Sequence, residues 1–288
     1  MKDKISMFFY NIIRFLLIHL PPVTGRYLGR AVAKLAYLLT SKRRKIVVSN
    51  LKKALALNDQ EAKSLLKEVY LNLGYNFTEF LKQDTFSRED IEEMVEFTGL
   101  EYLEAAAAEG NGVILYTGHF GNWELLGAIL DKKGYSIDAI AREQNNSLFD
   151  KKINQIRENS GVGVIPKGLA VRKVFKSLKQ NKVVAFLGDQ DARGRGWKLK
   201  FFERDASTYT GAVEFAQRTG AVIVPVFLHR RGWLKHELIA YPLRKIGKDL
   251  SEAELKKELQ ALVKITEDEI KKAPANWMWL HKRWKTYS

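Results

Sequence analysis

A histidine lies between two glycines in the stretch TGHFGNWE, residues 117–124, and a glutamate follows it by five positions. On a continuous helix, five residues would leave the side chains of His119 and Glu124 roughly 140° apart, so they could not meet. They can meet only if His119 lies in a turn and Glu124 lies in the first turn of the helix that follows. A carboxylate beside an imidazole selects the tautomer of the ring and stabilises the imidazolium that forms on proton uptake. The spacing therefore predicts a general base, His119, oriented by Glu124.

The sequence lacks the motifs of several other enzyme classes, and this limits the reactions in which His119 and Glu124 could take part. The sequence has no Gly-x-Ser-x-Gly elbow, no P-loop and no dinucleotide fingerprint, and HFGNWE is not the His-Glu-x-x-His of a zinc peptidase. Five scattered histidines and no cysteine argue against a metal site, and we expect no cofactor. A base and an orienting carboxylate without a protein nucleophile predict direct acyl transfer to a substrate hydroxyl. The alternative is that His119 caps a helix and Glu124 interacts with the helix dipole.

Short apolar runs, each leading into a helical pattern or a loop, begin near residue 110. Strands that alternate with helices of this length predict an α/β fold with a mostly parallel central sheet flanked by helices. Residues 25–83 and 251–272 have apolar residues at helical spacing and predict further helices. The predicted strands are residues 112–117, 135–141, 162–166, 182–188 and 221–230.

Polar residues gather at the predicted carboxyl ends of these strands. Ligands bind beyond those ends in sheets of this kind, so the polar residues are expected to line a site. They are His119, Arg142, Asp189, Gln190, Arg230 and Arg231.

Charge is distributed unevenly over the 288 residues, although the whole chain carries a formal net charge of +15. Residues 1–60 hold 12 Lys and Arg against 2 Asp and Glu, whereas residues 61–111 hold 4 against 12. A basic N-terminal block suggests a polyanionic partner: nucleic acid, an anionic membrane surface or an acidic protein. The absence of cysteine excludes disulfides and a cysteine nucleophile, and it suits a reducing compartment.

The apolar run Met7–Leu20 decides among these partners. It is interrupted only by Asn11, Arg14 and His19, and two prolines end it. Fourteen residues are short for a membrane span, which needs about 20, and fit an interfacial or barely spanning helix. A buried core helix and a cleaved signal peptide are the alternatives, but no small-residue cleavage site follows the run. We therefore expect residues 1–24 to form a membrane-anchoring helix, residues 25–288 a single domain, and the basic stretch 41–45 to face lipid headgroups.

Four blocks of the sequence, in order, resemble one family. GHFGNWE after an apolar strand resembles the catalytic motif of the lysophospholipid acyltransferase superfamily, in the form used by the late acyltransferases of lipid A biosynthesis. Residues 142–167, which open with an arginine, and residues 183–230 are similar to the second and third blocks of that family. Residues 274–285, PANWMWLHKRWK, are similar to its C-terminal signature. One departure is that Glu203 follows Phe201-Phe202, where the family usually has a glycine.

The resemblance implies an acyl-carrier-protein thioester as donor and a hydroxyl of an acylated, phosphorylated glucosamine disaccharide as acceptor. It also implies a location at the cytoplasmic face of the inner membrane. A basic surface suits both an acidic carrier protein and a phosphorylated lipid, and no nucleic acid is expected. Acyl transfer to another glycolipid, such as a mannosylated phosphatidylinositol, is a close alternative. A non-catalytic basic protein that binds membranes or nucleic acid is a more distant one, which would bind with a steep salt dependence and consume no thioester.

Roles follow for the remaining residues of the expected site. Arg142 is expected to bind substrate phosphate or stabilise the oxyanion, or else to form only a surface salt bridge. Asp189 and Gln190 are expected to shape the site by hydrogen bonding, with helix capping as the alternative. Asn122 is expected to cap the helix after the motif, whose free N–H groups could help to hold the oxyanion. The tryptophans of the C-terminal signature, Trp277, Trp279 and Trp284, are expected to pack in the core rather than form an interfacial belt.

Overall fold

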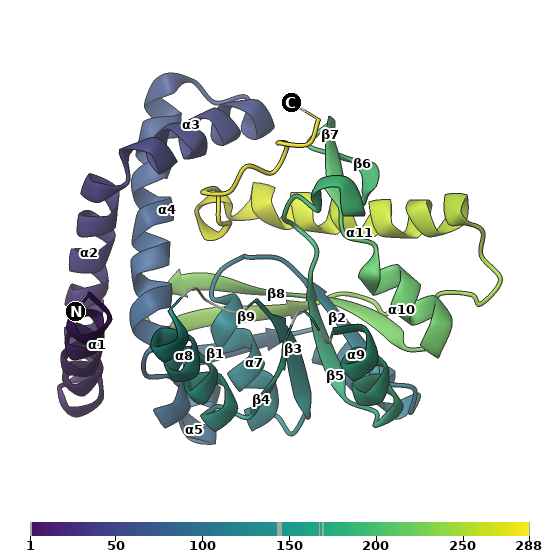
Figure 1. The fold of residues 1–288 in the computed structure, drawn as a ribbon, viewed down its shortest axis with the longest axis horizontal. Coiled ribbons are helices and arrows are strands. Elements are labelled where there is room, and N and C mark those ends of the chain that lie inside the picture. The colour runs from purple at the N-terminus through teal and green to yellow at the C-terminus, as the bar shows by residue number, and fades with distance from the viewer. Residues whose placement is uncertain (1, 143–145, 167, 169, 288) are drawn as a thin grey trace.

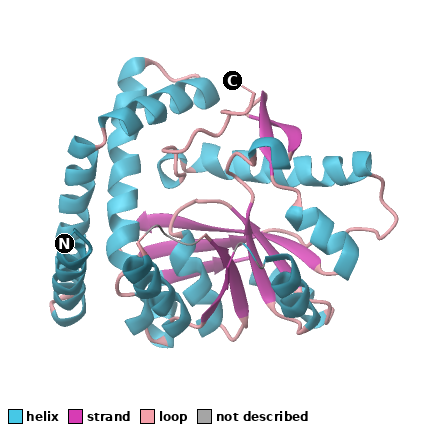
Figure 2. Ribbon diagram, in the orientation of Figure 1, coloured by secondary structure: helices cyan, strands magenta, loops and turns pink. Residues whose placement is uncertain are grey.

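A seven-stranded sheet forms the centre of the protein, with the strand order β1-β9-β8-β2-β5-β3-β4. Helices cover both of its faces (Figures 1 and 2). The computed structural model describes residues 2–142, 146–166, 168 and 170–287. The strands of the sheet are β1 (Val95–Thr98), β2 (Val113–Thr117), β3 (Ile137–Ala141), β4 (Val162–Pro166), β5 (Val183–Leu187), β8 (Val222–Gly232) and β9 (Lys235–Ala240).

Neighbouring strands of this sheet are parallel except for β8 and β9, which form an antiparallel hairpin. The predicted α/β class and the five predicted strands are thus confirmed. Strands β1 and β9 lie beside each other at one edge and were not predicted. A separate two-stranded antiparallel hairpin, β6 (Trp197–Phe201) with β7 (Arg204–Thr208), also escaped prediction because it lies inside what reads as a long loop.

Alternate residues of β2 point to two different hydrophobic layers, as the pleat of a strand requires. Val113 and Leu115 lie in one cluster, and Ile114 and Tyr116 lie in the other. All four are at most 1% exposed, which explains why this strand reads as a continuous apolar run. The first layer contains α5 (Arg88–Met94), α6 (Leu100–Ala108) and α7 (Trp123–Lys132); the second contains α9 (Ala170–Lys179), α10 (Gly211–Thr219) and α11 (Glu252–Lys272).

The chain begins with the helices α1 (Lys2–His19), α2 (Pro22–Leu39), α3 (Ser41–Leu55) and α4 (Asp59–Phe80), which come before α5 and the first strand of the sheet. Helix α4 begins with a capping box, in which Asn58 and Glu61 satisfy each other's backbone N–H groups. Helix α1 packs through Tyr10 and Leu17 on the end of α4 and on α8 (Ser147–Asn159). In the part of the chain that the structure describes, none of the helices combines the length and the apolar character that a membrane crossing requires.

Candidate active site

The motif turn connects β2 to α7 and is made possible by Gly121. Its φ angle is +54°, and a Cβ at this position would lie 1.6 Å from the carbonyl oxygen of Leu228. Only glycine fits so close to another backbone. Asn122 then caps α7, since its side chain accepts a hydrogen bond from the Leu125 N–H at 3.2 Å, as expected for an N-cap. The predicted turn followed by a helix is confirmed.

Hydrogen bonds hold the backbone of this turn on all sides. The carbonyl of His119 accepts from the Met278 N–H at 2.9 Å, and the Gly121 N–H donates to the Asn276 carbonyl at 2.9 Å. The Gly121 carbonyl accepts from the side chain of Asn76 at 2.5 Å. Helix α4 and the C-terminal segment both form hydrogen bonds with the turn. The backbone that carries His119 is therefore fixed before any substrate binds.

His119 pairs with Asp189, which follows β5. Its Nδ1 lies 2.9 Å from Oδ1 of Asp189, and its backbone N–H donates to Oδ2 at 2.8 Å. Burial alone would raise the pKa of the Asp189 carboxyl, but the charge and the hydrogen bonds of His119 outweigh it and hold this pKa well below its usual range. Asp189 is therefore an anion. An anion at Nδ1 favours the tautomer in which Nδ1 carries the proton and Nε2 is free to act as a base.

Two aromatic residues of the C-terminal segment hold Asp189 from the other side. Trp277 Nε1 donates to its Oδ2 at 2.8 Å, and His281 Nε2 lies 3.2 Å from its carbonyl oxygen. Burial lowers the pKa of His281. Trp277, Trp279 and Trp284 are all buried, so their predicted core packing is confirmed. The hydrogen bond from Trp277 to Asp189 was not predicted from the sequence.

Gln190 lies at hydrogen-bond distance from the second ring nitrogen of His119. Its Nε2 lies 3.1 Å from Nε2 of His119, on the pocket side of the ring. This position is where a hydroxyl of a substrate would have to come to give up a proton. Gln190 is thus within reach of both the base and the group it would act on.

Glu124 and His119, which are both described, share no hydrogen bond or ion pair in this structure. Both carboxylate oxygens of Glu124 accept hydrogen bonds from Arg157 of α8 instead, at 2.9 Å from Nε and at 2.7 Å from Nη2. Burial would lower the pKa of the Arg157 guanidinium, but the bond to Glu124 raises it. The expected His119–Glu124 contact is replaced by a His119–Asp189 contact, and Glu124 ties α7 to α8 instead.

The register of the sheet explains which carboxylate reaches the imidazole. Thr117 of β2 lies opposite Leu187 of β5 in a parallel pair. His119 and Asp189 each follow two residues later, so parallel pairing brings them to the same point beyond the sheet. Glu124 lies in the first turn of α7, where the carboxylate interacts well with the helix dipole but extends toward α8.

A cavity of about 630 Å³ opens beside His119, a volume within the usual range for small-molecule sites. Its walls come from the ends of β2, β3 and β5 and from the start of α10. No Ser, Thr or Cys is among the described residues that line it. The apolar part consists of Ile140, Ala141, Ala185, Phe186, Leu187, Ala192 and Ala212, and the polar part includes Tyr116, Gln190, Asp191 and Tyr209.

Three arginines line the same cavity. Arg142 follows β3, where the sequence predicted it, and Arg193 and Arg195 come from a short 3₁₀ turn after β5 that was not singled out. Neither Arg193 nor Arg195 forms an ion pair with a described acidic residue. Their only sequence signal was the repeated Arg-Gly in ARGRG, residues 192–196. The cavity therefore combines an apolar wall with a cationic rim.

Arg230 and Arg231, by contrast, do not reach the cavity, although they were expected at a strand end. Arg231 forms a surface ion pair with Glu237. Arg230 lies within the long strand β8, and its guanidinium is buried against both carboxylate oxygens of Glu79, at 2.5 and 2.6 Å. Strand β8 continues past the point where the expected strand stops, so these residues are part of the sheet and not of its end.

Glu79 is the centre of a buried polar network behind the motif turn. Its carboxylate also accepts from the side chain of Asn122 at 2.8 Å, which fixes the cap of α7. Burial would raise its pKa, but Arg230 and His236 hold that pKa well below its usual range. Asn72, Asn76 and Glu79 are spaced i, i+4 and i+7 on one face of α4, and this polar stripe on an otherwise apolar face was the sequence signal for the network.

Glu203, the departure from the family pattern, lies at the tip of the β6–β7 hairpin. Phe202 and Glu203 have φ angles of 49° and 56°, the combination that a two-residue type I′ turn requires. Glycine adopts this conformation without strain, whereas another residue costs about 1 kcal/mol. Glu203 therefore occupies a turn position, and the cavity beside His119 does not include it among its described lining residues.

The fold and the site define the class of this protein: an α/β protein with a histidine–carboxylate pair at the strand ends of its sheet and an apolar, cation-rimmed cavity. Residues 2–286 match the model of the family described as bacterial lipid A biosynthesis acyltransferase. The chain belongs to this family of acyltransferases, and the resemblance noted in its four sequence blocks is confirmed.

Individual relatives cover different shares of the chain. It is 28% identical over 279 residues to the lipid A biosynthesis lauroyltransferase of Escherichia coli (strain K12), across 95% of this chain and 89% of that protein. It is 24% identical over 284 residues to the lipid A biosynthesis palmitoleoyltransferase of the same strain, with the same coverage. It is 29% identical over 193 residues to the phosphatidylinositol mannoside acyltransferase of Mycobacterium tuberculosis (strain CDC 1551 / Oshkosh), across 65% of this chain and only 58% of that protein's length.

Proposed function

We propose that this protein transfers a fatty acyl chain from an acyl-carrier-protein thioester to a hydroxyl of a phosphorylated glycolipid, by direct attack and without an acyl-enzyme. The observation that carries the proposal is the His119–Asp189 pair, which opens on a cavity with no serine, threonine or cysteine among its described lining residues. The family match supports acyl transfer as the reaction class.

The proposed proton path runs through Nε2 of His119. The acceptor hydroxyl gives its proton to Nε2 while its oxygen attacks the thioester carbonyl carbon, so that a C–O bond forms. The tetrahedral intermediate then expels the thiolate as the C–S bond breaks, and the imidazolium returns the proton to sulfur. Asp189 stabilises the imidazolium between these steps through its bond to Nδ1. Glu124, through Arg157, positions the helices on which this depends.

The charge on the carbonyl oxygen in the intermediate needs hydrogen-bond donors. We assign this to the free N–H groups at the start of α7, which Asn122 caps, or to the guanidinium of Arg142. Arg142 serves equally as a phosphate ligand, because a guanidinium binds phosphate with two parallel hydrogen bonds. Gln190 completes the site by orienting the acceptor hydroxyl toward His119.

Two glycolipids are candidates for the acceptor. A lipid A precursor is favoured by the family and by the relatives that cover nearly the whole chain. A mannosylated phosphatidylinositol is the second candidate, favoured by the similarity to a phosphatidylinositol mannoside acyltransferase. Both acceptors carry phosphate, and the three arginines of the cavity suit either.

A lipid acceptor requires contact with a membrane, and the N-terminal helices offer a suitable face. The apolar side chains of α1 that do not pack on the domain are exposed, and α2 continues the same character. We propose that this face lies in the membrane interface on the cytoplasmic side, with residues 1–24 as the anchor and the rest as the catalytic domain. The exposed side chains are Phe8, Phe9, Ile12, Phe15, Ile18, Leu20, Val23, Tyr27, Leu35, Leu38 and Leu39.

The test is incubation of the purified protein with acyl-carrier-protein thioesters of several chain lengths and, in parallel, a lipid A precursor or a mannosylated phosphatidylinositol. We expect thioester consumption that depends on one acceptor and is abolished in His119→Ala. Steeply salt-dependent binding without any thioester consumption would instead identify a non-catalytic binding protein.

A further inference from the structure

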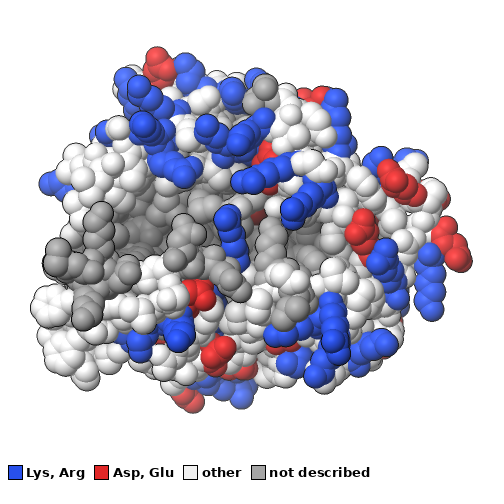
Figure 3. Space-filling model, viewed as in Figure 1, with Lys and Arg blue, Asp and Glu red and all other residues white. Residues whose placement is uncertain are grey.

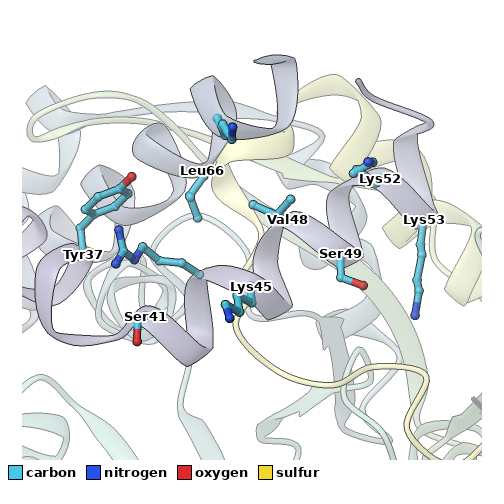
Figure 4. A pocket seen from close by; sticks show the side chains of 10 residues that line it. Tyr37, Ser41, Lys45, Val48, Ser49, Lys52, Lys53 and Leu66 are labelled. Carbon is cyan, nitrogen blue, oxygen red and sulfur yellow. The ribbon is translucent and has the colours of Figure 1, made fainter. Parts of the chain in front are cut away.

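A basic groove lies between the end of α2, helix α3 and the start of α4. It has a volume of about 710 Å³. No Asp or Glu is among its described lining residues. Figure 4 shows these side chains, with Leu66 and Val48 in the middle, Tyr37 at one side, Lys45 below and Lys52 and Lys53 at the other side. The lining residues are Tyr37, Ser41, Arg44, Lys45, Val48, Ser49, Lys52, Lys53, Lys63 and Leu66.

Helix α3 presents two rows of side chains to this groove. Arg44, Val48 and Lys52 form one row at i, i+4 and i+8, and Lys45, Ser49 and Lys53 form the next row. From Arg44 to Lys53 the rows extend over roughly 14 Å of helix. The groove thus has Val48 and Leu66 among lysines that come from α3 and, in Lys63, from α4, a lining that suits a short amphipathic helix.

Most of the cations of the groove are not neutralised by the protein itself. Lys45, Lys53 and Lys63 form no ion pair with any described residue, whereas Lys52 pairs with Asp59 at 2.7 Å. Figure 3 shows that Lys and Arg side chains gather over the upper part of this face, where α3 and the C-terminal segment lie in Figure 1. Uncompensated charge of one sign attracts a partner of the opposite sign.

We propose that this groove docks an acidic amphipathic helix of the acyl carrier protein that delivers the thioester. The inference rests on the proposed function for the identity of the partner. Acidic side chains of the partner helix would pair with Lys45, Lys53 and Lys63, and its apolar side chains would cover Val48 and Leu66. Charge complementarity of this kind sets the rate of encounter and the choice of partner more than the final affinity.

The groove lies on the opposite side of α2 from the proposed membrane face. Tyr37 is two residues from both Leu35 and Leu39, so its side chain points roughly 160° away from theirs around the helix. Leu35 and Leu39 are exposed, while Tyr37 lines the groove. A flat lipid surface that contacts the first two residues therefore does not fill the groove. This geometry favours a protein partner over lipid headgroups.

The groove is linked to the catalytic pair through the C-terminal segment. A second cavity shares Lys45, Ser49 and Lys53 with the groove and extends to Lys282 and Trp284 of that segment. From α3, the side chain of Asn50 donates to the carbonyls of Trp279 and His281, each at 2.9 Å. His281 in turn contacts Asp189. A carrier protein docked on α3 would therefore stand beside the segment that holds the active site, and its flexible thioester arm would enter from there.

Charge reversal tests the proposal, with a matched control. The variant Lys45→Glu/Lys53→Glu changes the groove. The control Lys248→Glu/Lys257→Glu makes the same change in net charge at exposed lysines near the start of α11, on the other side of the molecule (Figure 1). Transfer is measured with two donors, a lauroyl-loaded acyl carrier protein and the lauroyl thioester of pantetheine alone. Binding of fluorescently labelled carrier protein is measured by anisotropy, and thermal melts check folding.

We expect the groove variant to lower kcat/KM about tenfold or more with the carrier-protein donor and to weaken carrier binding by a similar factor, because steering charges act on association. Its kcat/KM with the pantetheine thioester should stay within about twofold of the unaltered protein, as should both values for the control. Equal losses with the two donors, or equal losses in the control, would overturn the proposal. Weakened binding to anionic vesicles together with unchanged carrier binding would assign the groove to lipid and also overturn it. If the unaltered protein uses neither donor, the proposed function fails, and anisotropy still decides the docking.

Discussion

Two histidine–carboxylate pairs lie close together in this protein, one at the cavity and one in the core. His119 pairs through Nδ1 with Asp189, and its side chain remains 20% exposed. His229 pairs through Nε2 with Glu269, and both side chains are at most 1% exposed. The two are neighbours, because Phe120, which follows His119 in the chain, packs its ring on His229 with centroids 4.7 Å apart.

The environments of the two pairs differ on the side away from the carboxylate. The second nitrogen of His119 faces the cavity, next to Gln190. The second nitrogen of His229 is buried and has no hydrogen-bond partner among the described residues. Glu269 also accepts a hydrogen bond from the Tyr241 hydroxyl and pairs with the Lys272 ammonium at 2.7 Å. The same pair of residue types therefore makes a base where a substrate can reach the ring and a structural link where none can.

Removing the accessible imidazole should have the largest effect on turnover and little effect on stability. His119→Ala should lower kcat by about 10⁴-fold, by analogy with triads that lose their base. Its thermal midpoint should fall only modestly, because the ring is partly exposed and the buried Asp189 keeps the hydrogen bonds from Trp277 Nε1 and from the backbone N–H of residue 119. Thioester consumption with lipid acceptor and thermal melts measure both. Near-normal turnover by folded His119→Ala would show that the chemistry lies elsewhere.

Neutralising the partner of that imidazole should cost nearly as much. Asp189→Asn keeps the size of the side chain but loses the charge that selects the tautomer and stabilises the imidazolium, so kcat should fall about 10³–10⁴-fold. The double variant with His119→Ala should be scarcely worse than His119→Ala alone, since the two residues act as a unit. Losses that multiply in the double variant would contradict the pairing seen in the structure.

The buried pair should show the reverse pattern. His229→Ala leaves a cavity beside Phe120 and removes a partner of the buried Glu269 carboxylate, so it should lower the free energy of unfolding by about 2–4 kcal/mol. Turnover per folded molecule should fall about tenfold at most, a change of roughly 1.4 kcal/mol in the barrier. Urea unfolding and active-site-normalised rates separate the two quantities. A loss of turnover as deep as that of His119→Ala would make His229 part of the chemistry.

A substitution of Glu124 distinguishes the predicted His119–Glu124 pair from the observed His119–Asp189 pair. Glu124→Gln should lower kcat by about tenfold at most, because it weakens a half-buried ion pair with Arg157 and leaves His119–Asp189 intact. Arg157→Gln serves as the matched change, since it breaks the same ion pair from the other side and should give a similar loss. If Glu124→Gln instead matched Asp189→Asn in kcat, Glu124 would be the catalytic carboxylate and the observed contact would not be the working one.

Acid should affect the buried pair in a defined window. Burial would raise the pKa of Glu269, but hydrogen bonds from His229, Lys272 and Tyr241 lower it from 4.5 to about 2. Because the pKa is lower in the folded state, the stabilisation by this carboxylate is present above pH 4.5 and is lost as the pH falls toward about 2. Unfolding midpoints in urea should therefore fall less steeply over this range in Glu269→Gln than in the unaltered protein. Parallel slopes would mean that Glu269 is not ionised in the fold.

Much of the fold could be predicted because its signals are local. Buried parallel strands read as continuous apolar runs, and all five predicted ones are present. Strands β1 and β9 were missed because they alternate polar with apolar residues over a short length, as in the VEFT of Val95–Thr98. The carboxyl ends of β2, β3 and β5 were predicted to gather His119, Arg142, Asp189 and Gln190. In the structure His119, Arg142 and Gln190 line one cavity, and Asp189 is buried behind His119 and bonded to it.

The sequence by itself determined the motif turn, because a glycine that tolerates the approach of Leu228, an N-capping asparagine and a following apolar helix are all local features. It could not determine which carboxylate meets His119. Asp189 is 70 residues away, and its contact depends on the strand order and on the parallel register of β2 with β5. Glu124 was the nearer carboxylate along the chain, but the direction of its side chain was set by Arg157 of another helix. Only the tertiary structure decided these partners, because side chains far apart in sequence pair according to how their elements pack and not according to their spacing.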